Sequence, residues 1–445
     1  MKNQAVDRNH VLSLYRQLVT TGPAEFPVEL EKIAVARVCR AYGLDPLEAE
    51  VPGRLDMLAS RRPRFKKGRL NLPGAGPSEK TVASDVYWDL SLLYHLPTNF
   101  LKLRRPLFDL ALQGLLPAHV RLLDVGTGTG TMALCVLDFY RRLAELSPGT
   151  GFRIDIYLLD QNPVLLKTAR YLIENYRRSY LTGLEVGRLE TIHKTVTPRT
   201  RFIRSIGFNL ITVGHFINQA ELPGLKAQRR ILTQIANALS EDGSLVLIEA
   251  PDPAEATSLQ IIKEHLTSAT SLNVYAPCAY FQRRVLTGST RNHSFDTFDW
   301  QPPLSIQWLH RQAGTPSPDR LGYTYLVFRR DGRVKYTGIP TGDYLPLSHF
   351  PSFVGQRVNL MGTVCSVADR SGSELVRLTL CDGSVCSHNY SVLVLSGQER
   401  SELNQGLLTA RTGNLVQVQN VPLMKQKCPR YHLPLQHDTR VTVWP

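Results

Sequence analysis

The 445-residue sequence has few cysteines, no long apolar run and fewer acidic than basic residues. Its seven cysteines are an odd number scattered through a large chain, which argues against a disulfide framework and for reduced thiols. No stretch approaches the roughly eighteen uninterrupted apolar residues of a membrane span, and the N-terminal segment lacks the apolar core of a signal peptide. We therefore expect a soluble, cytoplasmic protein with no membrane partner.

The deficit of negative charge is large. The chain holds 38 Asp and Glu against 52 Lys and Arg, a formal net charge of +14. Such a surplus favours a polyanionic partner, because Lys and Arg displace the counterions that condense on phosphates; a basic surface that only aids solubility is the alternative. Six of the cations fall within residues 61–69 (RRPRFKKGR), ahead of a Pro/Gly-rich stretch. This segment is either a phosphate-binding arm or a solvated tether.

Three regions differ in their pattern. Residues 1–118 show apolar residues at helical spacing and predict a helical N-terminal region. Over residues 119–340, apolar strands alternate with amphipathic helices, which predicts a doubly wound α/β domain with a parallel sheet. Residues 350–445 show five short strand patterns separated by Gly, Ser and Asp, which favour a small OB-like β-barrel. Such a barrel binds single strands or loops of nucleic acid, or serves as an interaction module.

A glycine-rich loop lies between the first strand and the first helix of the α/β domain. It contains Asp124, Gly126, Gly128 and Gly130 in the run DVGTGTG. Glycines let the backbone turn sharply and approach a ligand, and the following helix offers free N–H groups. The G-x-G-x-x-G pattern of dinucleotide-binding folds is absent. An acid at the head of the loop is typical of enzymes that bind S-adenosylmethionine (SAM), so we predict a class I SAM-methyltransferase domain, with NAD as the alternative cofactor.

The second strand of this domain ends in Asp160, where a carboxylate is placed to accept hydrogen bonds from both ribose hydroxyls of the cofactor. Thr127, Gln161 and Gly214 complete the predicted set of cofactor-binding residues together with Asp124 and the three loop glycines.

The candidate catalytic residues, His215 and Asn218, follow the fourth strand. In an open α/β sheet this position lies at the carboxyl edge, over the cofactor, where either side chain can orient a methyl acceptor. His215 can equally be a loop histidine without a catalytic role. Glu249 ends the fifth strand and either caps the site or pairs with a cation. Two acceptor signatures are missing: the N-P-P-Y tetrad of base-amino methylases and the Pro-Cys of cytosine-C5 methylases.

Several segments between about residue 90 and residue 390 resemble one family, the methyltransferase-like small-ribosomal-subunit proteins of mitochondria and many bacteria. YHLPTNFLKLRRPL (94–107) resembles the family's R-x-P-x-T-Y-x-x-x-x-R segment, and LLDVGTGTGTMAL its LLDVGxGPGT-A loop, with Thr129 in place of proline. LVLIEAPDPAEA, YTYLVFRRDG and VRLTLCDGS resemble later family segments. The resemblance implies a SAM-binding core, a β-rich C-terminal part and association with small-subunit ribosomal RNA during assembly, whereas it does not establish methyl transfer.

The chain departs from this family at its cysteines. The family's cysteine cluster, which holds an iron–sulfur centre, begins A-P-C-P-H. Here Cys278 keeps that start and Cys381 matches a strand cysteine, but the stretch after Cys278 lacks the intervening cysteines. Two thiolates do not hold a four-ligand cluster, and Cys386 and Cys428, the latter near His432, are the remaining candidates. We therefore predict no metal site.

Three hypotheses of function follow. The chain is a SAM-dependent methyltransferase acting on small-subunit ribosomal RNA or its assembly, a non-catalytic assembly factor that keeps the fold, or a small-molecule methyltransferase whose C-terminal part is a lid or dimerisation module. The first two predict a steep salt dependence of RNA affinity, and the third predicts none. The fold alone does not separate them.

Overall fold

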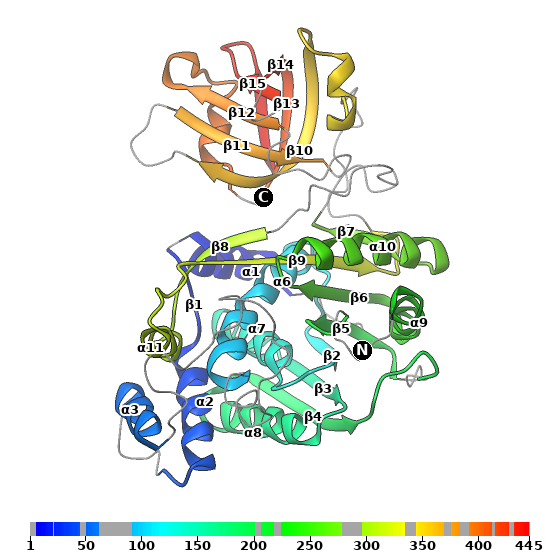
Figure 1. The fold of residues 1–445 in the computed structure, drawn as a ribbon. Helices are drawn as coiled ribbons and strands as arrows, with labels where there is room; N and C mark the ends of the chain where they lie inside the picture. Colours follow the sequence, from blue (N-terminus) through cyan, green and yellow to red (C-terminus); the bar gives the residue numbers. More distant parts are fainter. Residues whose placement is uncertain are drawn as a thin grey trace. The chain divides into compact units, whose positions relative to one another are not determined.

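A computed structural model gives the fold of the chain (Figure 1). It describes residues 6–20, 22–44, 50–61, 91–200, 206–217, 224–277, 296–333, 344–368, 375–382, 391–411, 414–426 and 431–444. Most of the predicted basic arm, from residue 62 on, lies outside these residues, as does the candidate catalytic residue Asn218. The chain divides into two compact units, Met1–Glu249 with Thr297–Tyr323 and Ala250–Asp296 with Thr324–Pro445. None of the described helices is long and apolar enough to cross a membrane.

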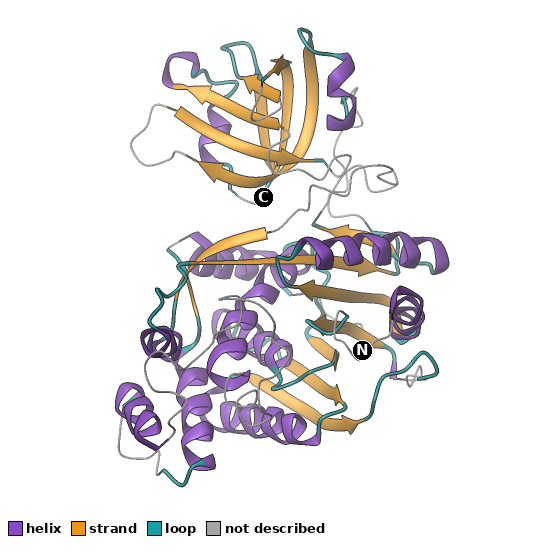
Figure 2. Ribbon diagram, in the orientation of Figure 1, coloured by secondary structure: helices purple, strands orange, loops and turns teal. Residues whose placement is uncertain are grey.

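Short helices form the N-terminal region, as the apolar spacing predicts (Figure 2). Helix α2 buries Leu30, Ala34 and Val38, which recur every four residues along one helix face, together with Val35 beside them. The described helical elements before β2 are α1 (Arg8–Tyr15), the π-helical turn η1 (Arg16–Thr20), α2 (Val28–Ala41), α3 (Val51–Arg61), the π-helical turn η3 (Ser91–His95), α5 (Leu96–Phe100), the 3₁₀ turn η4 (Leu101–Leu103) and α6 (Arg104–Ala111).

A nine-stranded mixed sheet follows, with the order β1-β8-β9-β6-β5-β2-β3-β4 and β7 paired to β9. Its strands are β1 (Ala24–Glu25), β2 (His119–Val125), β3 (Phe152–Asp160), β4 (Leu184–His193), β5 (Phe208–Gly214), β6 (Leu239–Glu249), β7 (Asn273–Ala276), β8 (Asp296–Gln301) and β9 (Arg320–Arg329). The helices between them are α7 (Thr131–Leu146), α8 (Pro163–Tyr180), α9 (Gly224–Ala236), α10 (Pro253–Ala269) and α11 (Leu304–Ala313).

The order in which strands are added to the sheet reverses at β2. Strands β3 and β4 lie on one side of β2, strands β5 and β6 on the other, and all these neighbours are parallel. A doubly wound sheet binds ligands at such a switch point, outside the carboxyl ends of the strands. The α/β architecture predicted from the sequence is therefore confirmed, and β2, β3 and β5 bring their carboxyl ends to one place.

Local sequence explains why these elements form. All residues of β5 before Gly214 are buried, which suits a central strand covered on both faces. Helix α8 begins where Asn162 Oδ1 accepts hydrogen bonds from the N–H groups of Val164 and Leu165, with Pro163 in the first turn.

A seven-stranded sheet forms the C-terminal part, in the order β14-β15-β12-β11-β10-β13-β16. Its strands are β10 (Arg357–Ala368), β11 (Leu375–Cys381), β12 (Ser391–Ser396), β13 (Leu415–Pro422), β14 (Met424–Lys425), β15 (Tyr431–Pro434) and β16 (Arg440–Trp444). The pairs are antiparallel except β12 with β15. Alternate apolar residues build its core, among them Leu360, Leu378, Leu393, Val418 and Leu433.

The predicted OB-like barrel is not supported. Strands β14 and β16 stand at the two ends of the sheet, and no pairing between them closes it in the described part of the chain. The five predicted strands are present, but alternation of apolar residues identifies strands without saying which partner each one takes. The prediction failed at that step.

Candidate cofactor site

The loop between β2 and α7 needs its glycines. Gly126, Gly128 and Gly130 have φ angles of 66°, 54° and 84°, in the left-handed region that favours glycine. A Cβ at Gly126 would strike the ring of Phe216, and one at Gly130 would lie 3.1 Å from Ala169 Cβ. A Cβ at Gly128 would meet nothing within 4 Å. The outer two glycines thus allow close packing, and the middle one faces open space.

Asp124 lies beneath this loop rather than at its surface. The side chain is 1% exposed, and its two oxygens accept hydrogen bonds from Thr127 Oγ1 at 2.5 Å and Thr212 Oγ1 at 2.7 Å. Burial raises the pKa of Asp124 to about 6, and the two threonine hydroxyls oppose that shift. Asp124 and Thr127 thus tie the loop to β5 through Thr212, and the contact of both residues with the cofactor stays a prediction.

Asp160 ends β3 and reaches the same loop. Its Oδ2 accepts a hydrogen bond from Gly128 N at 2.8 Å, and its Oδ1 accepts one from Asn162 N at 2.8 Å. The carboxylate is partly exposed, and an ionised carboxylate has about four acceptor positions, so it can accept further donors. The glycine loop and the acid at the strand end, both recognised in the sequence, are therefore in direct contact. Gln161 is exposed beside it, and its backbone oxygen contacts His193 Nε2 at 2.9 Å.

His215 follows β5 with a φ of 53°, an uncommon value for a residue other than glycine. Its backbone N–H donates to Ile248 O at 2.8 Å, and its Nε2 lies 3.4 Å from Lys102 Nζ. Burial lowers the pKa of His215 well below its usual value, and the nearby Lys102 and His95 add to the shift. The pKa of His95 is lowered to about 4, by burial and then by Lys102. Both imidazoles are therefore neutral near pH 7.

Lys102 is the site residue that sequence reasoning missed. It lies in η4, is 6% exposed, and donates a hydrogen bond to Asn99 Oδ1 at 2.7 Å. The available signal was its place inside the 94–107 segment that resembles a family motif, because nothing local marks one lysine among its neighbours.

Glu249 and Gly214, two residues singled out in the sequence, hold the structure around the end of β5. Glu249, 1% exposed, accepts the N–H of Ile217 through Oε1 at 3.0 Å, and Gln228 Nε2 donates to Ile217 O at 2.9 Å. Glu249 thus fixes the segment after β5. A Cβ at Gly214 would lie 2.5 Å from Met132 Cε, so this glycine allows α7 to approach β5, and its contact with the cofactor stays a prediction.

The described residues contain no group of three or more His, Cys, Asp or Glu able to hold a metal ion. Cys39 and Cys135 are buried thiols, and burial raises the pKa of each. Cys278, Cys386 and Cys428, which the resemblance brought into question as cluster ligands, lie outside the described residues.

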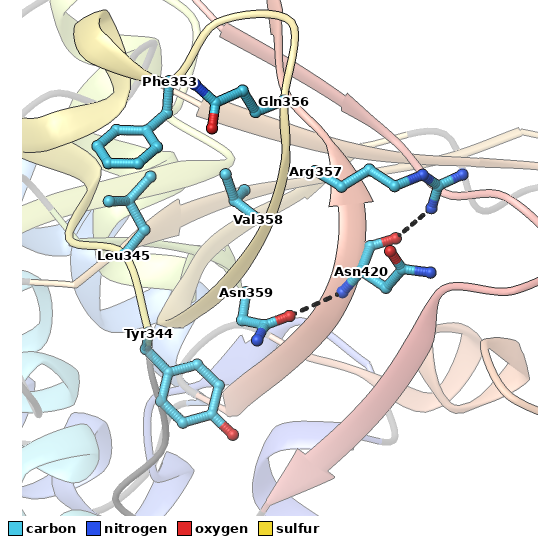
Figure 3. A pocket seen from close by; sticks show the side chains of 8 residues that line it. All are labelled: Tyr344, Leu345, Phe353, Gln356, Arg357, Val358, Asn359 and Asn420. Carbon is cyan, nitrogen blue, oxygen red and sulfur yellow. Dashed lines mark hydrogen bonds between the residues drawn. The ribbon is translucent and has the colours of Figure 1, made fainter.

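A second candidate surface lies on the C-terminal sheet, where a hollow of about 420 Å³ opens beside the start of β10 (Figure 3). Aromatic and amide side chains line it together with one arginine; the lining residues are Tyr344, Leu345, Phe353, Gln356, Arg357, Val358, Asn359 and Asn420. Arg357 Nη1 donates to Asn420 O at 2.7 Å and lies 3.2 Å from a carboxylate oxygen of Asp438. None of the seven strands of this sheet contains an Asp or a Glu.

No protein-family model and no curated protein matches the chain. Among solved structures, the chain is similar to a SAM-dependent methyltransferase from Aquifex aeolicus, with 18% identity, a TM-score of 0.28, and coverage of 44% of this chain and 94% of that one. The YcgJ protein of Bacillus (13% identity, TM-score 0.27, coverage 48% and 94%) and the plantazolicin methyltransferase BpumL in complex with SAH (8% identity, TM-score 0.27, coverage 72% and 98%) are similar too. Similarities with TM-scores this low do not assign the chain to a family. The resemblance to the small-ribosomal-subunit family stays a prediction.

Proposed function

We propose that the chain binds SAM at the loop after β2 and is a SAM-dependent methyltransferase or a methyltransferase-like factor. The pair of Gly128 and Asp160 carries this proposal. A glycine in the left-handed region faces open space, and the acid at the tip of the neighbouring strand holds its N–H group. Backbone that a ligand can approach closely, next to a carboxylate able to accept ribose hydroxyls, is what an adenosyl cofactor needs.

The residues present fit this cofactor. Asp160 would accept the ribose hydroxyls, and the loop before α7 would support the rest of the molecule. Bound SAM supplies a methyl group on a sulfonium centre. His215 is neutral near pH 7 because burial lowers its pKa, and its Nε2 faces the Lys102 ammonium group. With Nε2 as the acceptor of that contact, the other ring nitrogen carries the proton and would donate a hydrogen bond to a methyl acceptor and orient it.

Calorimetric titration with S-adenosylhomocysteine tests the cofactor site. A Gly128→Arg variant fills the open space beside the loop and should abolish binding. Gly149→Arg is the matched control, because Gly149 also has a positive φ (93°) with nothing within 4 Å of its would-be Cβ, but lies after α7. Equal affinity in the two variants would show that the ligand binds elsewhere or that no such site exists.

The C-terminal sheet supports a second proposal, contact with RNA. Its acid-free strands carry Arg357, Arg377, Lys425 and Arg440, and the hollow beside β10 offers Tyr344 and Phe353 with three amide side chains. Cations attract phosphates, while aromatic rings and amides suit unpaired bases. The resemblance to small-ribosomal-subunit proteins makes small-subunit ribosomal RNA, or an assembly intermediate that contains it, the proposed partner.

Fluorescence anisotropy of the full chain with a labelled single-stranded RNA, repeated over a series of salt concentrations, tests this second proposal. RNA binding with a steep salt slope is the expected result. Methyl incorporation into the bound RNA would identify an enzyme, and binding without incorporation an assembly factor. Absence of salt-dependent binding would leave the small-molecule methyltransferase as the best hypothesis.

A further inference from the structure

The buried cation beside the proposed cofactor site is Lys102. A buried ammonium group is costly unless hydrogen bonds and nearby charges compensate it, and lysine is seldom buried to this extent. Lys102 Nζ donates to the amide oxygen of Asn99 and lies 3.4 Å from His215 Nε2. These two contacts fix the direction of the ammonium group.

The location of Lys102 relative to the sheet follows from the strand register. Val213 of β5 pairs with Val125 of β2, and His215 comes two residues after Val213. The next residue, Phe216, lies against Gly126. The Lys102 ammonium group is therefore at the carboxyl edge of the sheet, on the β5 side of the glycine loop.

Asp160 lies on the other side of the same loop. It ends β3, which pairs with β2 along the edge opposite to β5. A ligand whose ribose is held by Asp160 and which extends over Gly128 thus runs from β3 towards β5. SAM carries its ribose in the adenosine half and a carboxylate at the far end of its methionine half.

We propose that Lys102, oriented by Asn99, binds the carboxylate of the methionine half of the cofactor. This inference rests on the proposed function and adds to it the direction of the ligand across the sheet. The contacts with Asn99 and His215 remain, and the carboxylate joins them. A charge-assisted hydrogen bond in a partly buried place contributes about a tenfold to hundredfold gain in affinity.

Two ligands distinguish binding of the carboxylate by Lys102 from a role of Lys102 in supporting the fold. S-adenosylhomocysteine contains the amino-acid half with its carboxylate, and 5′-methylthioadenosine contains the adenosine and sulfur without it. Calorimetry on the wild-type full chain should show tighter binding of the first. In Lys102→Met, affinity for S-adenosylhomocysteine should fall about tenfold to a hundredfold, while affinity for 5′-methylthioadenosine stays the same. Lys226→Met, an exposed lysine of α9, is the matched control.

The outcomes are distinct. If Lys102→Met loses affinity equally for both ligands, Lys102 only supports the fold. If it loses affinity for neither ligand, Lys102 does not contact the ligand. Either result overturns the inference. Wild-type protein that binds both ligands equally would overturn it while leaving the cofactor site standing. Wild-type protein that binds neither ligand would overturn the proposed function and this inference with it.

Loss of folding in Lys102→Met would not prevent the test. The comparison of the two ligands on wild-type protein needs no variant. Lys102→Arg keeps the positive charge, so it should retain the preference for S-adenosylhomocysteine, and loss of that preference in a folded Lys102→Arg protein that still binds 5′-methylthioadenosine would count against a role based on charge.

Discussion

The ammonium group of Lys102 and the Nε2 atom of His215 are 3.4 Å apart at the end of β5. A cation at this distance disfavours protonation of the imidazole, and His95 next to the pair experiences the same effect. Lys102, from the segment before β2, therefore adds to the effect of burial in keeping the histidine after β5 neutral. The group formed by Lys102, His215 and His95 can be tested by the pH dependence of stability and by ligand binding.

The pH dependence of stability should report the buried histidines. The pKa of His95 is about 4 in the folded chain, against about 6.5 for an ordinary histidine. As the pH falls from about 6.5 to about 4, the unfolded chain takes up a proton that the folded chain does not, so the free energy of unfolding should fall across this window. Urea denaturation at a series of pH values measures the slope. His95→Gln should have a shallower slope, and an unchanged slope would contradict the assignment.

A buried charge cluster on α7 should matter more than any surface ion pair. The carboxylate of Asp138 accepts from Arg141 Nη2, Arg142 Nε and Tyr176 Oη at 2.8 to 2.9 Å, and Arg104 lies 3.7 Å away. The arginines hold the pKa of Asp138 below its usual value although burial opposes them. Asp138→Asn leaves buried guanidinium groups without their counter-charge and should lower the free energy of unfolding by about 3–5 kcal/mol.

The control for that substitution is Glu174→Gln. Glu174 forms an exposed pair with Arg170 one turn away on α8, at 2.7 Å. Exposed pairs of this kind contribute about 0.3–0.5 kcal/mol, so the variant should denature almost as the wild type does. Equal losses in the Asp138 and Glu174 variants would mean that the cluster does not stabilise the fold.

The loop glycines should separate stability from binding. Gly126→Ala puts a methyl group into the ring of Phe216, whereas Gly128→Ala adds one where nothing lies within 4 Å. Both carry the strain of a left-handed residue, roughly 1–2 kcal/mol. Thermal unfolding should therefore show the larger loss for Gly126→Ala, and titration with S-adenosylhomocysteine should show weaker binding by a folded Gly128→Ala protein. Equal stability losses would remove the packing argument.

The sequence identified those parts of the site that depend on local pattern. Glycines between an apolar strand and a helix, and an acid at the next strand end, can be recognised without knowing the partners of each residue, so Gly128 and Asp160 were found. Asp124 was found as well, but its enclosure by Thr212 was not predicted, because that contact depends on the pairing of β2 with β5. Lys102 was missed for the same reason, since it reaches His215 through tertiary packing alone.

In the C-terminal sheet too, the local pattern predicted the strands but not their pairing. Alternating apolar residues predicted its strands, and Leu360, Val418 and Leu393 do face one core. Pairing depends on contacts distant in sequence, such as the parallel pairing of β15 with β12, which ends at Pro434. Short strands that contain proline give a weak pattern, and β15 was accordingly not predicted.

The proposed RNA contact predicts a specific effect at Arg440. This arginine is exposed on β16, its register partner on β13 is Gln419, and the strands around it contain no carboxylate. If it neutralises one phosphate, Arg440→Gln should weaken RNA binding and reduce the slope of log affinity against log salt by roughly 0.7 to 0.9. The affinity for S-adenosylhomocysteine should not change.

Arg320→Gln is the matched control for Arg440→Gln, because Arg320 is equally an exposed strand arginine but is paired with Asp299 at 2.9 Å. Anisotropy titrations at several salt concentrations should give the wild-type slope for this control and the reduced slope for Arg440→Gln. A reduced slope in both variants would mean that the chain attracts RNA through its net charge of +14 as a whole. An unchanged slope in both would place the RNA contact away from β16, since one phosphate contact fewer must alter the number of counterions released.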